Sequence, residues 1–448
     1  MTENFQVLKF GGTSMGSKQS LNQVLEILKD KIKSKKIYVV VSAMSGVTDK
    51  LIELGLSAKN NQLKPQILQE IENLHQKTLV EFGLTLESSP LELLFQELED
   101  ALTKEIFINE IPQETYLDFI KSFGERLSAS LLTSILKINS VKAEFVDARE
   151  LIVTDENFGN ASVDYEVSTE RTKNYFQNLE SQIPNLQVLV ITGFIGRSSK
   201  GATTTLGRGG SDFTGGLLAN FLDSRMVEIW TDVDGVLSTD PRISSEAKII
   251  NQLSFSEAFE VAYYGGKVLY PKTMEACLPK NISIVIKNTF NPQAKGTVVT
   301  TESLPGLKVV SRNKNITIVE IIFGSITSEI GLLGRIFSWF SLERITIDVV
   351  TTSGDSVSFS CDKNPSKDLI EKIETEIGQI RILENQEIVA LIGTNILNQE
   401  NYLKIMNFMV GFKPKMISMN TKNTNLTVVV ESGQGEELIS RIHPLIIQ

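Results

Sequence analysis

The first two thirds of the chain alternate short apolar runs with stretches that carry apolar residues at helical spacing. The apolar runs predict strands at Phe5–Phe10, Ile37–Ser42, Ala143–Asp147, Gln187–Thr192, Met226–Thr231 and Ile282–Lys287. Helical spacing is found at 18–35, 49–59 and 212–223, and throughout 64–138. Strands that alternate with helices form parallel sheets covered on both faces, so this region is predicted to be α/β with a mostly parallel sheet.

The pattern changes after a turn-rich segment that covers residues 288–306. We therefore expect one large domain over residues 1–300. Beyond it, strands are predicted at 315–322, 346–351 and 356–361, with helices at 331–343 and 367–377. A similar order recurs between 386 and 443, which indicates a repeat of about 70 residues. Two small α+β domains, 307–384 and 385–448, are therefore expected.

Composition narrows the classes of function. The chain has 448 residues, of which 41% are hydrophobic, and a net charge of −10, which suits a soluble protein of two or three domains. The acidic balance argues against a nucleic-acid surface. Cys277 and Cys361 are far apart and predict neither a disulfide framework nor a cysteine-based metal site. With only His75 and His443, a histidine triad or histidine metal centre is not expected.

The amino-terminal sequence lacks the pattern of a secretory signal. The chain also contains no apolar run of membrane-spanning length. A cytoplasmic location, without membrane or nucleic-acid partners, is therefore expected.

Two glycine-rich blocks carry the candidate chemistry. The first, Lys9–Ser14, follows the first predicted strand with two glycines and two hydroxyls. Glycine lets a backbone approach a phosphate closely, and a helix start offers free N–H donors to an anion. The block matches neither a P-loop nor a dinucleotide fingerprint. By itself it could be an ordinary turn.

The second block, Thr203–Ala219, follows the strand predicted at 187–192. Ser211 or Asp212 can cap the helix that begins there, and Arg208 has the planar fork that suits a carboxylate or a phosphate. Lys9, Ser42 and Thr231 all fall at the carboxyl ends of predicted strands. Ligands of parallel sheets bind beyond those ends, so one shared site is predicted.

Taken together in this order, seven segments resemble the aspartate kinases of the amino-acid-kinase superfamily over essentially the whole chain. The segments are Lys9–Ser14, Val41–Thr48, Phe123–Glu125, Thr204–Asp212, Trp230–Gly235, Thr239–Arg242 and Gly266–Leu269. The resemblance implies the amino-acid-kinase fold followed by two ferredoxin-like ACT domains, which are regulatory modules that bind amino acids. In the family the second ACT domain is nested within the first, so the 385–448 domain could be nested in the 307–384 domain. It also implies transfer of the γ-phosphate of ATP to the side chain of L-aspartate.

The resemblance further implies roles for individual residues. Lys9 and Asp212 are the catalytic candidates, Glu125 would bind the substrate ammonium, and Arg208 would bind its α-carboxylate. Ser42, Thr48, Ser211 and Asp212 would complete the aspartate pocket. The nucleotide would be held by Lys9, Phe10, Gly11, Gly12, Thr231, Asp232, Arg242 and Lys267. Mg²⁺ is expected with ATP, bound mainly by phosphates and water, so no protein ligand for a metal is assigned.

Regulation by lysine is a second implication of the resemblance. Thr346, Ile347, Asp348, Thr352 and Ser353 match the effector site of lysine-inhibited aspartate kinases. Such sites lie between paired ACT domains, so a homodimer or a dimer of dimers is expected. Read by pattern alone, Asp348 could equally cap a strand in a structural module.

Two alternatives remain open at this stage. The chain could be a non-catalytic amino-acid sensor on a decayed kinase fold, or a related kinase acting on glutamate or N-acetylglutamate. Leu237 and Tyr270 depart from residues common in the family. We expect those two departures to affect nucleotide affinity and to lie away from the phosphate- and aspartate-binding groups.

Overall fold

The computed structural model describes residues 5–266, 268–323, 331–396 and 399–447. The chain forms two compact units, one of residues 1–236 and 268–301 and one of residues 237–267 and 302–448. Within the described residues, no helix combines the length and the apolar character needed to cross a bilayer.

The first unit is built on a large sheet in which the strands run in the order β3-β5-β2-β1-β8-β10-β11. All neighbouring pairs are parallel except β10 with β11. The bounds are β1 Phe5–Phe10, β2 Lys36–Val41, β3 Ala143–Val146, β5 Val188–Thr192, β8 Met226–Thr231, β10 Ser283–Asn288 and β11 Thr297–Thr300. The mostly parallel α/β sheet is thus confirmed, with strand ends within a residue or so of those predicted.

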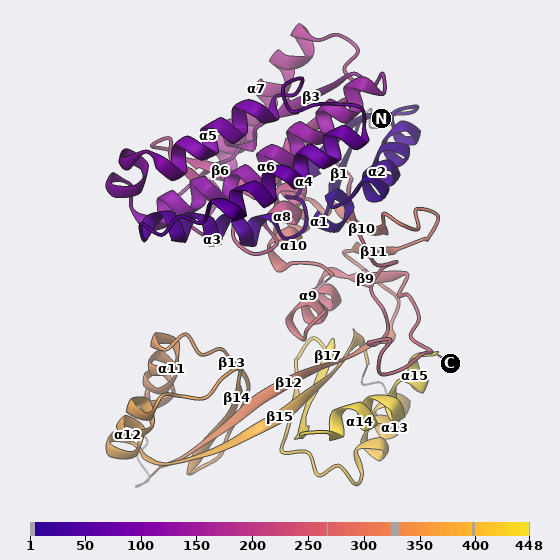
Figure 1. The fold of residues 1–448 in the computed structure, drawn as a ribbon. Helices are drawn as coiled ribbons and strands as arrows, with labels where there is room; N and C mark the ends of the chain where they lie inside the picture. Colours follow the sequence, from indigo (N-terminus) through magenta and orange to yellow (C-terminus); the bar gives the residue numbers. More distant parts are fainter. Residues whose placement is uncertain (1–4, 267, 324–330, 397–398, 448) are drawn as a thin grey trace. The chain divides into compact units, whose positions relative to one another are not determined.

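Helices cover this sheet (Figure 1). The long helical block predicted at 64–138 consists of α4 Pro65–Glu81, α5 Leu91–Thr103, a π-helix Ile106–Glu110 and α6 Gln113–Ile138. Helix α6 packs against α3 Val47–Lys59, α4 and α5. The remaining helices of the unit are α1 Gly12–Met15, α2 Lys18–Lys31, α7 Tyr165–Gln182, α8 Gly210–Phe221 and α10 Pro271–Cys277. Buried apolar side chains of α2, α3, α5, α6 and the sheet form one continuous core.

A second, three-stranded sheet was not predicted. It contains β4 Val153–Thr154, β6 Ile195–Ser198 and β7 Thr203–Thr205, in the order β4-β6-β7. These strands are only two to four residues long, which is too short for an alternation of apolar and polar positions to be visible in the sequence. Strand β7 leads into the turn that precedes α8, so this small sheet positions the second glycine-rich block.

The second unit carries a six-stranded sheet in the order β13-β14-β12-β15-β17-β16, with every pair antiparallel. Its strands are β12 Gly306–Phe323, β13 Ile347–Thr352, β14 Ser356–Cys361, β15 Gly378–Thr394, β16 Met416–Met419 and β17 Asn425–Glu431. Its helices include α9 Phe255–Tyr263, α11 Leu332–Leu342, α12 Lys367–Glu376, α13 Gln399–Met409 and α14 Gln434–Ile442. Beyond residue 306, this order of elements follows the predicted α+β pattern.

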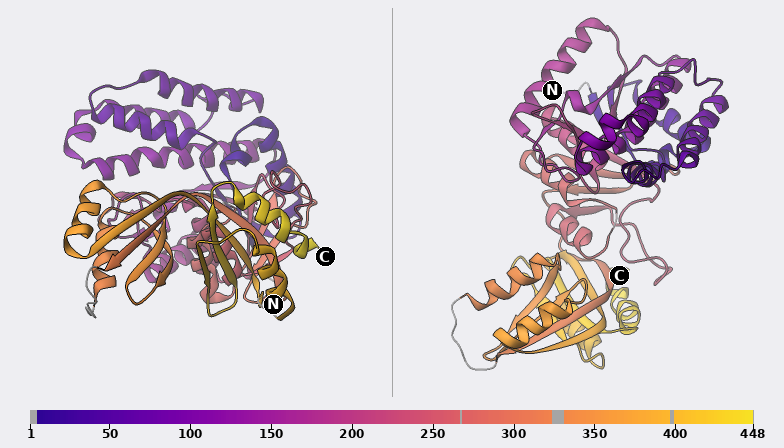
Figure 2. Two further views of the ribbon diagram at one scale, coloured as in Figure 1. Left: turned by 90° about the horizontal axis from the view of Figure 1, so that it is seen from below. Right: turned by 60° about the vertical axis from the view of Figure 1, so that its left-hand side comes forward.

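The two long strands β12 and β15 lie at the centre of this sheet and pair with each other. Helices α11 and α12 lie toward one end of the pair, and α13 and α14 toward the other (Figures 1 and 2). Each end has its own core: Val319, Ile336 and Phe359 belong to one, and Val310 and Leu426 to the other. Val310 belongs to β12 but packs with residues of the carboxyl-terminal half. The boundary between the two small domains at 384/385 remains a prediction.

Candidate active site

Three neighbouring strands of the first unit end at the same edge of the sheet. Phe10 at the end of β1 pairs in register with Val41 of β2 and with Trp230 of β8. The turns that follow are tied together, because the Ser42 N–H donates to the Phe10 carbonyl and the Gly11 N–H to the Trp230 carbonyl, each at 3.1 Å. This edge therefore brings together segments that are distant in the sequence.

A cavity of about 520 Å³ opens beside this edge. The structure places all seven residues predicted for catalysis and aspartate binding in its wall: Lys9, Ser42, Thr48, Glu125, Arg208, Ser211 and Asp212. The wall also contains residues that were not predicted, among them Asp49, Lys121, Phe194 and Tyr270. Several different elements thus contribute charged side chains to one polar pocket.

Lys9 and Asp212 form the central ion pair of this pocket. Lys9 Nζ lies 2.5 Å from Asp212 Oδ1, and the two side chains are only 9% and 7% exposed. Helix α8 can approach β1 closely at this point, because a Cβ on Gly215 would come within 3.3 Å of the Lys9 Cβ. The glycine-rich sequence of α8 therefore sets the position of Asp212 against Lys9.

The Gly124-Glu125 pair fits the wall for a steric reason. A Cβ on Gly124 would lie 2.8 Å from the Ala43 Cβ, so only glycine lets α6 pack this closely against the turn after β2. Glu125 Oε1 then accepts the Ala43 N–H at 3.2 Å, while Oε2 has no hydrogen-bond partner among the described residues. Burial raises the pKa of the Glu125 carboxyl to about 8.

Lys121 lies one helical turn before Glu125 and lines the same pocket. Its ammonium is 2.5 Å from Asp118 Oδ1 and donates to the Thr205 hydroxyl at 3.1 Å. Asp118 in turn accepts the Gly159 and Thr205 N–H groups, each at 2.8 Å. The sequence did carry a signal for this pair, since positions i−4 and i−7 lie on the Glu125 face of a helix.

Tyr270 was expected to lie away from the aspartate-binding groups, and that expectation was wrong. Its ring packs on Gly209, where a Cβ would lie 2.2 Å from the ring. Gly209 also has φ +71°, which favours glycine over residues with a side chain. Tyr270 therefore belongs to the pocket wall beside Arg208.

Two of the residues predicted to bind the nucleotide need correction. The Phe10 side chain is fully buried and its ring lies 5.8 Å from that of Trp230, so Phe10 can contact a nucleotide only through its main chain. The Gly11 N–H already donates to Trp230 and is not available to a phosphate in this arrangement. Gly12 begins α1, where the first N–H groups lack partners within the helix.

The other predicted nucleotide residues are divided between the two units. Thr231 ends β8, and its hydroxyl donates to Asp232 at 3.2 Å. Arg242 belongs to the second unit, where its exposed guanidinium pairs with Asp240. Lys267 lies outside the described residues. Asn288, which was not predicted, ends β10, and its amide donates to Asp234 at 2.8 Å.

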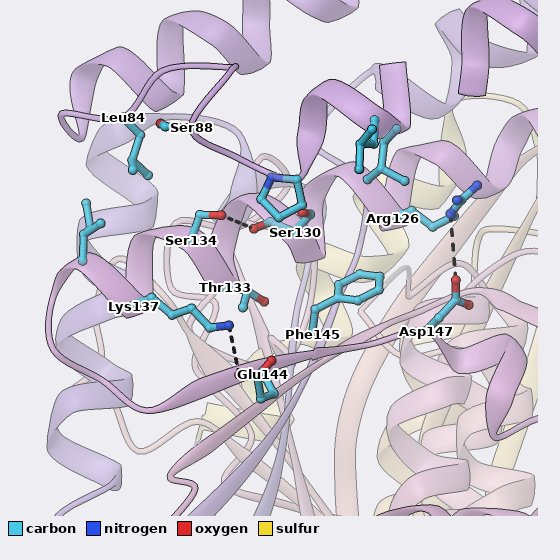
Figure 3. Close-up of a pocket in the computed structure, with 14 residues that line it drawn as sticks. Leu84, Ser88, Arg126, Ser130, Thr133, Ser134, Lys137, Glu144, Phe145 and Asp147 are labelled. Carbon is cyan, nitrogen blue, oxygen red and sulfur yellow. Dashed lines mark hydrogen bonds and ion pairs between the residues drawn. The ribbon is translucent and has the colours of Figure 1, made fainter. Parts of the chain in front are cut away.

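A second cavity, of about 500 Å³, lies on another face of α6 (Figure 3). Its wall includes apolar residues such as Leu84, Leu93 and Phe145, and its charged residues are paired. Arg126 binds both carboxylate oxygens of Glu97 and lies 3.8 Å from Asp147, and Lys137 lies 3.0 Å from Glu144. This cavity contains none of the residues predicted for catalysis.

The predicted effector residues lie on and around β13 in the second unit. Asp348 is half-buried and accepts a hydrogen bond from the Tyr264 hydroxyl at 3.4 Å. Burial raises the pKa of its carboxyl above the usual range. Thr346, Thr352 and Ser353 are exposed, and Ile347 is partly buried. Asp348 is thus a carboxylate on a surface-lying strand, with aromatic hydroxyls beside it.

The chain is similar to known proteins over nearly its whole length. The amino acid kinase family profile matches residues 4–288. The chain is 30% identical to lysine-sensitive aspartokinase 3 of Escherichia coli, over 98% of both chains. Two solved structures of E. coli aspartokinase III, each 27% identical, superpose with TM-scores of 0.80 and 0.81 and cover 99% and 100% of this chain and all of theirs. The first contains aspartate and ADP, and the second contains lysine and aspartate.

Proposed function

Because the chain belongs to the aspartokinases of the amino acid kinase family, we propose that it transfers the γ-phosphate of ATP to the side-chain carboxylate of L-aspartate. The product would be 4-phospho-L-aspartate, the first intermediate on the route to lysine, threonine and methionine. The observation that carries the proposal is the convergence of Lys9, Glu125, Arg208 and Asp212 on one pocket. A sensor that had lost catalysis would not need these four side chains in one pocket.

The pocket can read both α-substituents of an amino acid. Glu125 lines the cavity and its Oε2 has no hydrogen-bond partner among the described residues, so a substrate ammonium would give this carboxylate its missing partner. Arg208 is exposed in the same wall and offers a planar fork to the α-carboxylate. The side-chain carboxylate would then point toward Lys9.

Phosphoryl transfer needs little proton chemistry here. The attacking carboxylate of aspartate is already ionised at neutral pH, so no general base is required. Lys9 is preorganised by Asp212 at 2.5 Å and can offset charge on the phosphoryl group during transfer. With an ionised substrate and a preorganised Lys9, a pocket lined without histidine can therefore be catalytic.

ATP fits the polar groups at the carboxyl edge of the sheet. The turn that begins α1, the Thr231–Asp232 pair and the Asn288–Asp234 pair all follow the ends of β1, β8 and β10. They supply N–H, hydroxyl, amide and carboxylate groups of the kind that bind ribose and phosphates. Mg²⁺ would be held mainly by the phosphates and water, where it would offset their negative charge.

Lysine is the proposed feedback effector. The supporting observation is Asp348, a partly buried carboxylate whose neighbours are the Tyr264 hydroxyl and Glu260; an ammonium would complement this site. The proposed assembly is a homodimer or a dimer of dimers. Asp348→Ala should relieve inhibition by lysine and leave the uninhibited kcat unchanged. Asp368→Ala, which alters an exposed carboxylate of the same unit, is the matched control.

The decisive test is an ATP-dependent hydroxamate assay with aspartate, glutamate and N-acetylglutamate as acceptors. We expect turnover with aspartate alone, and its inhibition by millimolar lysine. Turnover with glutamate but not aspartate would favour the related kinase, and no turnover with any acceptor would favour a sensor. Inhibition by threonine without inhibition by lysine would contradict the effector assignment.

A further inference from the structure

Glu125 lies in a buried environment that disfavours the ionised form of its carboxyl. It is 3% exposed, and burial raises the pKa of its carboxyl to about 8. Under the proposed function, however, Glu125 must be ionised to hold the substrate ammonium. The Ala43 N–H, Lys9 and Lys121 are groups that favour the charged form.

The groups that face this corner come from every element around it. They are Lys9 of β1, Asp49 of α3, Lys121 of α6 with its partner Asp118, and Arg208 and Asp212 around the start of α8. Lys9 also favours the charged form of Glu125, but the proposed function assigns it, with Asp212, to the phosphoryl group, and Arg208 is exposed at the wall. Lys121 is the cation that lies on the same face of α6, one turn from Glu125.

Lys121 is held in place by a buried anchor. Asp118 is 1% exposed and accepts hydrogen bonds from the Gly159 N–H, the Thr205 N–H and the Thr205 hydroxyl. These bonds connect α6 to β7 and to the loop before α7, and fix the carboxylate against which the Lys121 ammonium rests at 2.5 Å. The Lys121 side chain is 13% exposed, so solvent screens its charge only weakly.

Resting on the proposed function, we propose that Lys121, fixed by Asp118, is a positioning residue that favours the charged form of Glu125 for the substrate ammonium and so sets the pH range of aspartate binding. Loss of Lys121 would remove a cation and leave the Asp118 charge without its partner. Both changes oppose ionisation of Glu125. Loss of the Asp118 charge would have the opposite effect, because Lys121 would then act on Glu125 alone.

The test is the pH profile of kcat/KM for aspartate, in which the acid limb reports a group of the free enzyme. Lys121→Met should move this limb to higher pH by about half a unit or more. Lys121→Arg should leave it in place, Asp118→Asn should move it to lower pH, and the double variant should return it toward wild type. Lys137→Met on the same helix, outside the pocket, is the control and should not move it.

A second readout does not depend on aspartate turnover. In the ligand-free protein, infrared spectroscopy can follow the protonated carboxyl band that Glu125→Gln removes. The pH at which this band disappears should rise in Lys121→Met and fall in Asp118→Asn. If the limb and the band stay in place while activity falls equally at all pH values, Lys121 is only structural and the inference is wrong. If the band shifts in a protein that shows no turnover with aspartate, the proposed function fails and the charge relation stands.

Discussion

Helix α6 forms part of the wall of two cavities of similar size, about 520 and 500 Å³, and the two differ in the state of their charges. In the cavity that contains Glu125, a carboxylate oxygen lacks a hydrogen-bond partner among the described residues. In the cavity of Figure 3, Arg126 and Lys137 have carboxylate partners, although Arg126 Nε, 3.8 Å from Asp147, lacks a hydrogen bond among the described residues. Cavity size alone therefore does not identify the candidate active site.

Glu125 and Arg126 show the contrast within two consecutive residues. Successive positions on a helix point in directions about 100° apart, so the two charges do not face each other. Glu125 lines the aspartate pocket, whereas Arg126 binds Glu97 and stacks 4.6 Å from the Phe123 ring. The first residue is poised to bind a ligand and the second holds α5 to α6.

The largest effect is expected from Lys9→Ala. Loss of one preorganised cation at the transferring group should lower kcat by about 10²–10³-fold and change the KM for aspartate much less. Lys137→Ala removes a lysine from the other cavity and should leave kcat unchanged. Steady-state kinetics at saturating ATP measures both. Turnover of Lys9→Ala within a few-fold of wild type would remove Lys9 from the mechanism.

The second largest effect is expected on the KM for aspartate. Glu125→Gln loses the charge that pairs with the substrate ammonium, and Arg208→Lys keeps the charge but loses the fork. Each variant should raise the KM for aspartate by about 10-fold or more and leave the calorimetric affinity for ATP nearly unchanged. An equal loss of affinity for both ligands would show that these residues act on the pocket as a whole.

The pH dependence of the free energy of unfolding should also show the effect of burying the Glu125 carboxyl. Its pKa in the folded protein, about 8, lies above its ordinary value of 4.5, so between these values the unfolded chain ionises and the folded one does not. The free energy of unfolding should therefore fall as pH rises from 4.5 toward 8, by on the order of 5 kcal/mol, and the loss should be constant above that range.

Glu125→Gln should lack this component of the pH dependence. The measurement is the difference in unfolding free energy between wild type and variant, determined by urea titration at pH 5 and pH 8. The variant should gain on wild type as pH rises. A difference that is the same at both pH values would mean that Glu125 is ionised in the ligand-free pocket.

The sequence predicted which segments form the pocket far better than it predicted which charged side chains surround Glu125. Lys9, Ser42 and Thr231 follow long apolar strands, so their meeting at one sheet edge could be inferred from the parallel arrangement. Lys121 and Asp118 have the helical spacing that places them on the Glu125 face, but charged residues recur on several faces of this block, and only the structure shows that Lys121 lines the pocket and pairs with Asp118. Tyr270 was misplaced because its contact with Gly209 depends on a left-handed turn.

The smallest effect on activity is expected from Arg126→Leu, even though Arg126 is adjacent to Glu125. The variant loses the pair with Glu97, which is 41% exposed and can be solvated after the change. It keeps an apolar side chain against Phe123. Unfolding free energy should fall by about 1 kcal/mol, measured by urea titration, whereas kcat and the KM for aspartate should stay within about twofold of wild type. A rise in that KM comparable to that of Glu125→Gln would show that the two cavities are coupled through α6 and that their charges do not act independently.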